Sequence, residues 1–164
     1  QRQMCIRDSN YINGRGYGFF KITEGESSGL WSVLRSSEDE VLKGSLLITL
    51  YENLRWKTIS PQGFREEMLA YLPNESNSLL FSMALSYLGD CQRIFPSDSR
   101  PLEQVLWKIV TTNPVSQHRL QAFRLYRSIA DSEEAVQRLY TLWQERKAPK
   151  DCTLSESDLS LIHI

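Results

Sequence analysis

Apolar residues recur every three or four positions along most of this chain, from about residue 28 to residue 147. The clearest example ends before Pro96, and its apolar residues are Leu80, Met83, Ala84, Tyr87, Leu88, Cys91 and Ile94. A spacing of three and four places such side chains on one face of an α-helix. The chain is therefore expected to fold as a set of amphipathic helices.

Turn and capping residues divide this region into segments. Ser37-x-x-Glu40 predicts a capping box that opens one helix. Ser60-Pro61 predicts the start of the next, because a capping serine precedes a proline at the first helical position. A first short helix is expected over residues 28–36, and Asp131-x-x-Glu134 predicts the start of the last helix.

The helices after the first fall into three antiparallel pairs, about residues 37–75, 75–113 and 115–147. Each pair spans roughly 35–40 residues, the size of a helical-repeat hairpin. We expect a mostly α fold, an α-superhelix or solenoid of antiparallel helix pairs of the HEAT-like kind, with a closed bundle as the alternative. A short extended segment is expected at Phe19–Ile22, near the N-terminus.

Two terminal peptides, Met4–Ser9 and Leu159–Ile164, lack the period of the chain between them. The codons ATG-TGT-ATA-AGA-GAC-AGN encode the first peptide. Their reverse complement, extended by a base or two, encodes the second, and this DNA word resembles a transposon mosaic-end adapter used for sequencing libraries. We expect residues 1–9 and 159–164 to be adapter translations, to be left out of fold reasoning. Residues 10–158 are then expected to be an internal fragment.

Composition argues against several classes of function. The formal net charge is −1, which gives no electrostatic reason to expect nucleic acid as a partner. No apolar run approaches the roughly 18–20 residues that span a bilayer, so no membrane span is expected. The 3 cysteines have no C-x-x-C spacing, which indicates neither a disulfide framework nor a zinc site.

Few side chains of the expected fragment suit catalysis. His118 is its only histidine and has no partner at metal-ligand spacing, so an exposed histidine is expected there. Cys91 lies on an apolar helical face and is expected to act as a small buried hydrophobe. Cys152 has no basic or histidine neighbour that would activate its thiol, and a nucleophilic role is not expected.

Arginines gather in the last predicted helix pair, with Phe123 and Tyr126 among them. They are Arg119, Arg124, Arg127 and Arg138. An anion-binding or nucleic-acid surface is one interpretation of this cluster. The net charge favours the other, in which these arginines lie on solvated helix faces or in ion pairs between helices. On chemistry alone, the fragment is expected to be a scaffold rather than an active site.

Six stretches carry a family resemblance, and none of them is a chemical motif. They are Asn13–Phe20, Leu50–Leu54, Tyr126–Ala130, Leu139–Trp143, Lys147–Lys150 and Leu154–Asp158. In this order they resemble the C-terminal part of aminopeptidase N-like zinc aminopeptidases, and the last two are similar to the linker and next helix start of bacterial members. The resemblance covers nearly all of residues 10–158.

The resemblance implies a domain organisation. Residues 10–26 would be the end of a small β-domain or its junction, and residues 27–158 an incomplete helical C-terminal domain. In such enzymes this domain caps the catalytic cleft and limits which peptides enter. The H-E-x-x-H zinc motif lies in an upstream catalytic domain and does not occur in this sequence. The fragment is therefore expected to hold no cofactor and to be inactive, with zinc in the parent enzyme's missing catalytic domain.

The resemblance also implies partners. They are the parent's own catalytic domain, within the same chain, and the peptide substrate. Arg124 and Arg127 are candidate contacts to the carboxylate end of a peptide in the substrate cavity, because arginine pairs well with carboxylates. The alternative is a stand-alone helical-repeat scaffold that binds another protein.

Overall fold

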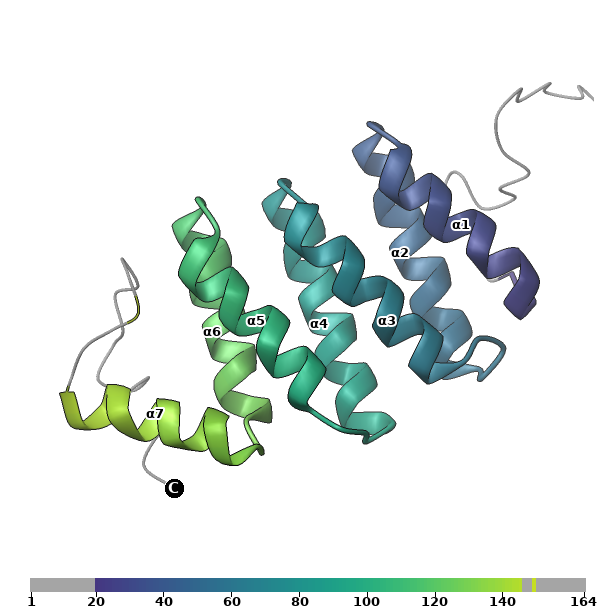
Figure 1. Cartoon of the computed structure of the whole chain (residues 1–164). Coiled ribbons are helices and arrows are strands. Elements are labelled where there is room, and N and C mark those ends of the chain that lie inside the picture. Colours follow the sequence, from purple (N-terminus) through teal and green to yellow (C-terminus); the bar gives the residue numbers. More distant parts are fainter. Residues whose placement is uncertain (1–19, 146–148, 150–164) are drawn as a thin grey trace, which may run out of the picture. The chain divides into compact units, whose positions relative to one another are not determined.

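The computed structural model describes residues 20–145 and residue 149. Its α-helices are α1 (Glu24–Ser36), α2 (Glu40–Arg55), α3 (Pro61–Tyr71), α4 (Ser78–Ile94), α5 (Arg100–Thr112), α6 (Ser116–Ile129) and α7 (Glu133–Glu145), and a 3₁₀-helix, η1 (Leu72–Asn74), follows α3 (Figure 1). No strand occurs among these residues. The prediction of a mostly α fold is confirmed.

Several predicted segments lie outside the described residues. These are residues 10–19, the expected adapter peptides at residues 1–9 and 159–164, and the region of Cys152. Phe20–Ile22, the described part of the predicted extended segment, has no regular secondary structure. No helix in the described part of the chain is long and apolar enough to cross a membrane.

The start of α2 differs from the sequence prediction. Asp39, not Ser37, is its N-cap, and its Oδ1 accepts hydrogen bonds from the backbone N–H groups of Val41 (2.9 Å) and Leu42 (3.1 Å). The predicted Ser37–Glu40 capping box was therefore wrong. Both residues are good cap formers, but Ser37 already ends α1, where its N–H bonds to the Val33 carbonyl. The predicted start of α3 at Pro61 is confirmed, with Ser60 Oγ accepting from Gly63 N at 2.9 Å.

A true capping box opens α1 four residues before its predicted start. Thr23 is the N-cap, and its hydroxyl accepts from the Glu26 backbone N–H while the Glu26 carboxylate accepts from the Thr23 N–H. These reciprocal bonds hold the pKa of Glu26 below its ordinary value, mainly through the backbone hydrogen bond from Thr23. The extra helical turn carries Glu24, whose Oε2 accepts from Ser60 N at 2.8 Å.

The chain divides into two compact units, residues 1–67 and 68–164, with the boundary inside α3. In the first unit α1 packs on α2. Its core includes Leu34, Leu46 and Leu50, all fully buried. Trp31 of α1 meets Phe64 edge-on, with ring centroids 5.6 Å apart. Apolar burial of this kind contributes about 25 cal/mol per Å².

The side chain of Asn53 joins the segment before α1 to α2. It is fully buried. Its amide nitrogen donates to the carbonyls of Phe20 (2.8 Å) and Thr49 (2.9 Å). Its Oδ1 accepts from Ile22 N (2.9 Å) and from Thr58 Oγ1 (2.7 Å). One amide thus uses both its donors and its acceptor to fix the path of the chain into α1.

The second unit is built around α6, which packs against both α4 and α5. Its core contains Phe81, Leu88, Leu106, Phe123 and Tyr126. Figure 1 shows α5 and α6 as neighbouring helices joined by a short turn. Cys91 is fully buried on α4, as predicted from its place on the apolar face. Within this unit, α5 and α7 form the two walls of a pocket.

Candidate functional site: a pocket between α5 and α7

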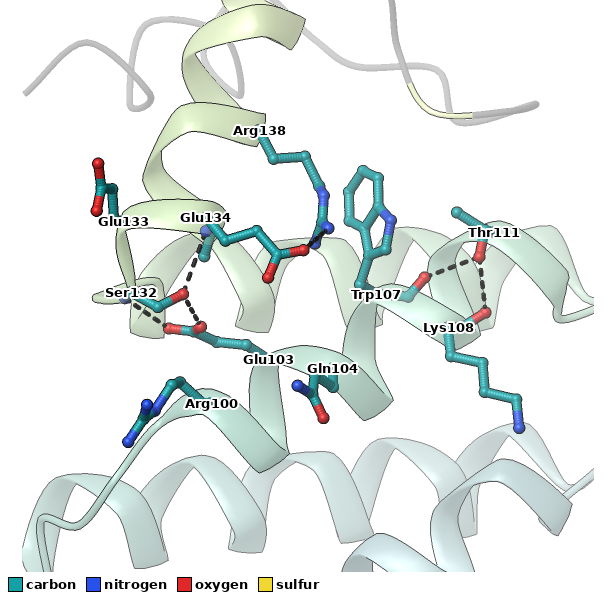
Figure 2. A pocket seen from close by; sticks show the side chains of 11 residues that line it. Arg100, Glu103, Gln104, Trp107, Lys108, Thr111, Ser132, Glu133, Glu134 and Arg138 are labelled. Atoms are coloured by element: carbon teal, nitrogen blue, oxygen red, sulfur yellow. Dashed lines mark hydrogen bonds and ion pairs between the residues drawn. The ribbon is translucent and has the colours of Figure 1, made fainter.

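A pocket of about 600 Å³ lies between α5 and the first half of α7 (Figure 2). Its lining is mostly polar and charged. The lining residues are Arg100, Glu103, Gln104, Trp107, Lys108, Thr111, Ser132, Glu133, Glu134, Ala135 and Arg138. The α5 residues recur at helical spacing along one face, so a single helix presents the whole of that wall. Positive and negative groups occur in equal number, and the pocket is therefore mixed in charge.

Three contacts hold the guanidinium group of Arg138 in the pocket. Its guanidinium lies 4.6 Å from the centroid of the Trp107 ring, and its Nη1 donates to Tyr126 Oη at 3.2 Å. It also forms an ion pair with Glu134, one turn earlier on α7. Figure 2 shows the Arg138 side chain reaching from α7 to the ring of Trp107 on α5. A cation over an indole face is worth about 0.5–1 kcal/mol at an exposed site.

Tyr126 contacts both Trp107 and Arg138. It is fully buried on α6, and its ring centroid lies 5.2 Å from that of Trp107. Burial raises the pKa of its hydroxyl, and the hydrogen bond from Arg138 opposes that rise only in part. The phenol therefore stays protonated and neutral through the physiological range. Its oxygen accepts from Arg138, which connects α7 to the core of the unit.

Glu103 closes the other end of the pocket and is only 4% exposed. Its carboxylate accepts from Asp131 N (2.8 Å), Ser132 N (3.1 Å) and Ser99 Oγ (2.9 Å), and also from Ser132 Oγ. Burial by itself raises the pKa of Glu103. The hydrogen bonds, from Ser132 first, outweigh burial and hold the pKa below its ordinary value. This side chain of α5 thus orders the turn that begins α7.

The sequence prediction for the start of α7 was close but not correct. The helix begins at Glu133 rather than at Asp131, and Ser132 Oγ accepts from Ala135 N at 3.2 Å. The N–H groups of Asp131 and Ser132 are taken by Glu103. A cap supplied by a residue 28 positions away carries no local sequence signal.

The arginines predicted as a cluster are divided among different places. Arg138 lines the pocket, whereas Arg119 is buried and its Nη1 donates to the carbonyls of Asn113 (2.8 Å) and Pro114 (3.2 Å). Arg124 is exposed on α6 and Arg127 is half-buried. Neither of these two is among the residues that line the α5–α7 pocket. Their contact with a peptide carboxylate stays a prediction.

His118 is buried, and its predicted exposure was wrong. It is 1% exposed, its ring stacks on Phe81 of α4 with centroids 4.0 Å apart, and its Nε2 lies 3.0 Å from Ser78 Oγ. The signal that could have revealed its burial is the spacing of four that places it on one line with Ala122 and Tyr126, both buried. Its partners lie about forty residues earlier, where sequence spacing gives no indication.

The Ser78–His118 pair does not have the arrangement of a catalytic serine and base. A working base needs a third group that orients its other ring nitrogen. His118 Nδ1 is buried and has no hydrogen-bond partner. Neither residue lines the α5–α7 pocket. The pair joins α4 to α6 as a packing contact.

We expect Arg138→Ala to lower the free energy of unfolding by about 1–2 kcal/mol, because it removes a cation–π contact and a hydrogen bond to a buried tyrosine. Arg138→Lys should recover only part of this loss, since an ammonium lacks the planar fork. Urea denaturation measures both. The matched control is Gln137→Ala, at an exposed position of the same helix, for which a change within about 0.5 kcal/mol is expected. Equal losses at Arg138 and Gln137 would contradict the role given to the Trp107 contact.

Comparison with known proteins identifies no relative: no family profile, curated protein or solved structure matches the chain. Among the described residues, no group of three or more histidine, cysteine, aspartate or glutamate side chains could hold a metal ion. The α5–α7 pocket combines an indole, an amide, ammonium and guanidinium groups and carboxylates. Together these groups can make stacking, hydrogen-bond and ion-pair contacts with a polar ligand.

Proposed function

We propose that residues 27–158 are part of the helical C-terminal domain of a zinc metallo-aminopeptidase, an enzyme that removes N-terminal residues from peptides. The fragment is non-catalytic. In the parent enzyme it caps the catalytic cleft and limits access to it. Zinc belongs to the parent's catalytic domain, which is the fragment's partner within the same chain.

The α5–α7 pocket is the observation that carries this proposal. Two of its arginines are paired within the protein: Arg138 with Glu134, and Arg100 with Asp98, whose Nη2–Oδ2 distance is 2.7 Å. Paired groups of this kind keep a surface polar without offering a strongly basic or nucleophilic atom. The wall of a substrate cleft must contact peptides without reacting with them, and a polar surface without such atoms meets this requirement.

The six stretches that resemble zinc aminopeptidases give the proposal its enzyme context. Within Leu50–Leu54, Asn53 holds the segment before α1 against α2. Within Leu139–Trp143, Leu139 is buried and Tyr140 is 47% exposed with its ring beside Trp143. Residues of these stretches therefore fix the entry to the helical region and the surface of its last described helix. These roles are structural, as expected for stretches whose resemblance to the family lies in packing motifs.

The proposal includes a solenoid arrangement of HEAT-like helix pairs. Support comes from the succession of helices of similar length, from 11 to 17 residues, joined by short turns. Within the second unit, α6 packs on the helix before it and on α4, as expected when one repeat stacks on the next. The pocket between α5 and α7 would then open on the face that lines the cleft.

The first test is an assay of the purified full chain with zinc and an aminoacyl reporter. We expect no stoichiometric zinc after dialysis and no cleavage of the reporter, because the catalytic motif lies in the missing domain. Zinc-dependent turnover that survives repurification would contradict the proposal. A mock preparation from cells without the expression plasmid controls for host aminopeptidases.

The second test measures peptide contact at the pocket. Short unstructured peptides, added to ¹⁵N-labelled chain, should shift the Trp107 indole signal and the α5 and α7 amides, with weak affinity, since binding in the parent relies on the catalytic domain too. Trp107→Ala should abolish the shifts of the α5 and α7 amides, and Arg124→Ala and Arg127→Ala show whether the predicted carboxylate contacts add to them. Tight binding of one folded protein in place of peptides would favour the stand-alone scaffold.

A further inference from the structure

His118 joins α4 to α6 through ring stacking and a hydrogen bond, while its second ring nitrogen has no partner. Its ring lies flat on Phe81, at an interplanar angle of 5°, and Nε2 bonds to Ser78 Oγ. Nδ1 is buried without a hydrogen-bond partner. A protonated imidazole donates from both nitrogens. Acid would therefore add a buried charge and a buried donor that has no acceptor, and both are costly.

From these contacts we propose that His118 makes the packing of α4 on α6 acid-sensitive, so that mild acid loosens the second unit of the chain at this contact. The acid sensitivity arises from the protonation of one side chain in a buried environment. It does not depend on the identity of the parent enzyme, and it adds a regulatory property to the proposed wall function.

The charged groups around His118 do not offset the cost of protonation. Glu75, in the turn before α4, is 4% exposed, and its carboxylate accepts from Tyr71 Oη and from Asn77 N at 2.7 Å. Its negative charge favours imidazolium, but burial disfavours it more strongly. Burial therefore leaves the pKa of His118 below its ordinary value, and Glu75 opposes that shift only in part.

The remaining neighbours add no acceptor for a proton on Nδ1. From α3, the Tyr71 phenol has its pKa raised by burial and by Glu75, so it stays neutral. On α6 itself, the Arg119 guanidinium donates to the carbonyls of Asn113 and Pro114. From α4, the contacts are Ser78 and Phe81, which do not titrate near neutral pH.

The sign of the pH dependence follows from linkage. The pKa of His118 is lower in the folded chain than its ordinary value of 6.5. Below that value the unfolded chain binds a proton that the folded chain does not, so stability is full above about pH 6.5 and falls as the pH drops toward the folded pKa. The urea midpoint of the second unit should therefore fall through this residue as the pH is lowered from 7.5 to 5.5.

The direct test is an NMR titration of the two histidine ring signals in the full chain. We expect the His118 signal, assigned with His118→Gln, to titrate at a pH below the ordinary histidine value of about 6.5. After correction for the intrinsic pH dependence of exchange, the protection of amides in α4 and α6 should fall more than that of amides in α2 over the same pH interval. A His118 signal that titrates at or above the ordinary histidine value would overturn the proposal.

Variants give a second, independent test. His118→Gln retains a group that can bond to Ser78, and His118→Phe retains the stacking on Phe81; neither can be protonated in this range. Both should remove the pH dependence of the urea midpoint that the wild-type chain shows between pH 7.5 and 5.5. If both His118 variants keep the wild-type pH dependence, the proposal fails. If neither variant folds, the ring titration of the wild-type chain decides.

Discussion

Asn53→Ala is expected to destabilise the first unit by about 2–4 kcal/mol. The substitution leaves the Ile22 N–H, the Phe20 and Thr49 carbonyls and the Thr58 hydroxyl without the partner that they share. Each buried group left without a hydrogen bond costs about 1–3 kcal/mol, and the exposed part of this set lowers the sum. Urea denaturation followed by tryptophan fluorescence measures the loss.

Two further variants locate the effect of Asn53. Asn53→Asp retains an acceptor for Ile22 N but cannot donate to the two carbonyls, and it places a buried negative charge beside them, so it should lose at least as much stability as alanine at neutral pH. Thr58→Val removes a single hydroxyl that bonds to the Asn53 side chain and should cost about 1 kcal/mol. If alanine at residue 53 changes the unfolding free energy no more than Thr58→Val does, the side chain does not hold the chain entry as described.

Glu103→Ala is expected to release α7 from the second unit. It removes the acceptor of the Asp131 and Ser132 N–H groups and of two serine hydroxyls. Bonds to a charged group contribute about 1.5–3 kcal/mol each in favourable cases, and we expect a total loss of about 3 kcal/mol because water can reach part of the turn. Hydrogen exchange should speed up in α7 before it does in α4 or in the buried part of α6.

Glu103→Gln is the matched control, since it keeps the volume of the side chain and one acceptor oxygen. It should lose less than alanine does. The pH dependence gives an independent check. The pKa of Glu103 is lower in the folded chain than its ordinary 4.5, so its contribution is present above that value and is lost as the pH falls through the folded pKa. An unchanged exchange rate in α7 of Glu103→Ala would refute this role.

The sequence predicts the helices well because each helix buries one face along its own length. In α4, four of the seven residues that carry the apolar period are buried, namely Leu80, Ala84, Leu88 and Cys91. Cys91 follows the same logic, and its burial is confirmed. The apolar period of a helix thus predicts which of its faces is buried.

The caps and polar contacts are harder to predict because their partners are distant or equivalent. Ser37 and Asp39 are both good N-caps, and only the end of α1 at Ser36 decides between them. His118 meets Ser78 and Phe81 from another helix. The spacing of four from Ala122 and Tyr126 indicates that His118 is buried, but no local spacing identifies its partners on α4.

The pocket could be predicted only in part. Arg138 stood out as one of several arginines, but Trp107 and Glu103 carried no signal that joins them to α7. Their spacing of four places both on one face of α5, but only the structure shows that α7 lies beside that face (Figure 2). The cluster of arginines named from sequence mixed one pocket residue with a buried anchor, Arg119. The presence of an arginine in the sequence does not show whether its side chain lines a pocket or lies in the core.

Long-read sequencing of the source DNA across both ends of this gene tests the central claim most directly. We predict one reading frame in which a native sequence replaces Met4–Ser9 and extends upstream to H-E-x-x-H and a following zinc-binding glutamate. A frame that encodes Met4–Ser9 and Leu159–Ile164 between its own start and stop codons would contradict the account. An extended frame without the zinc motif would contradict it equally, and the scaffold alternative would then take its place.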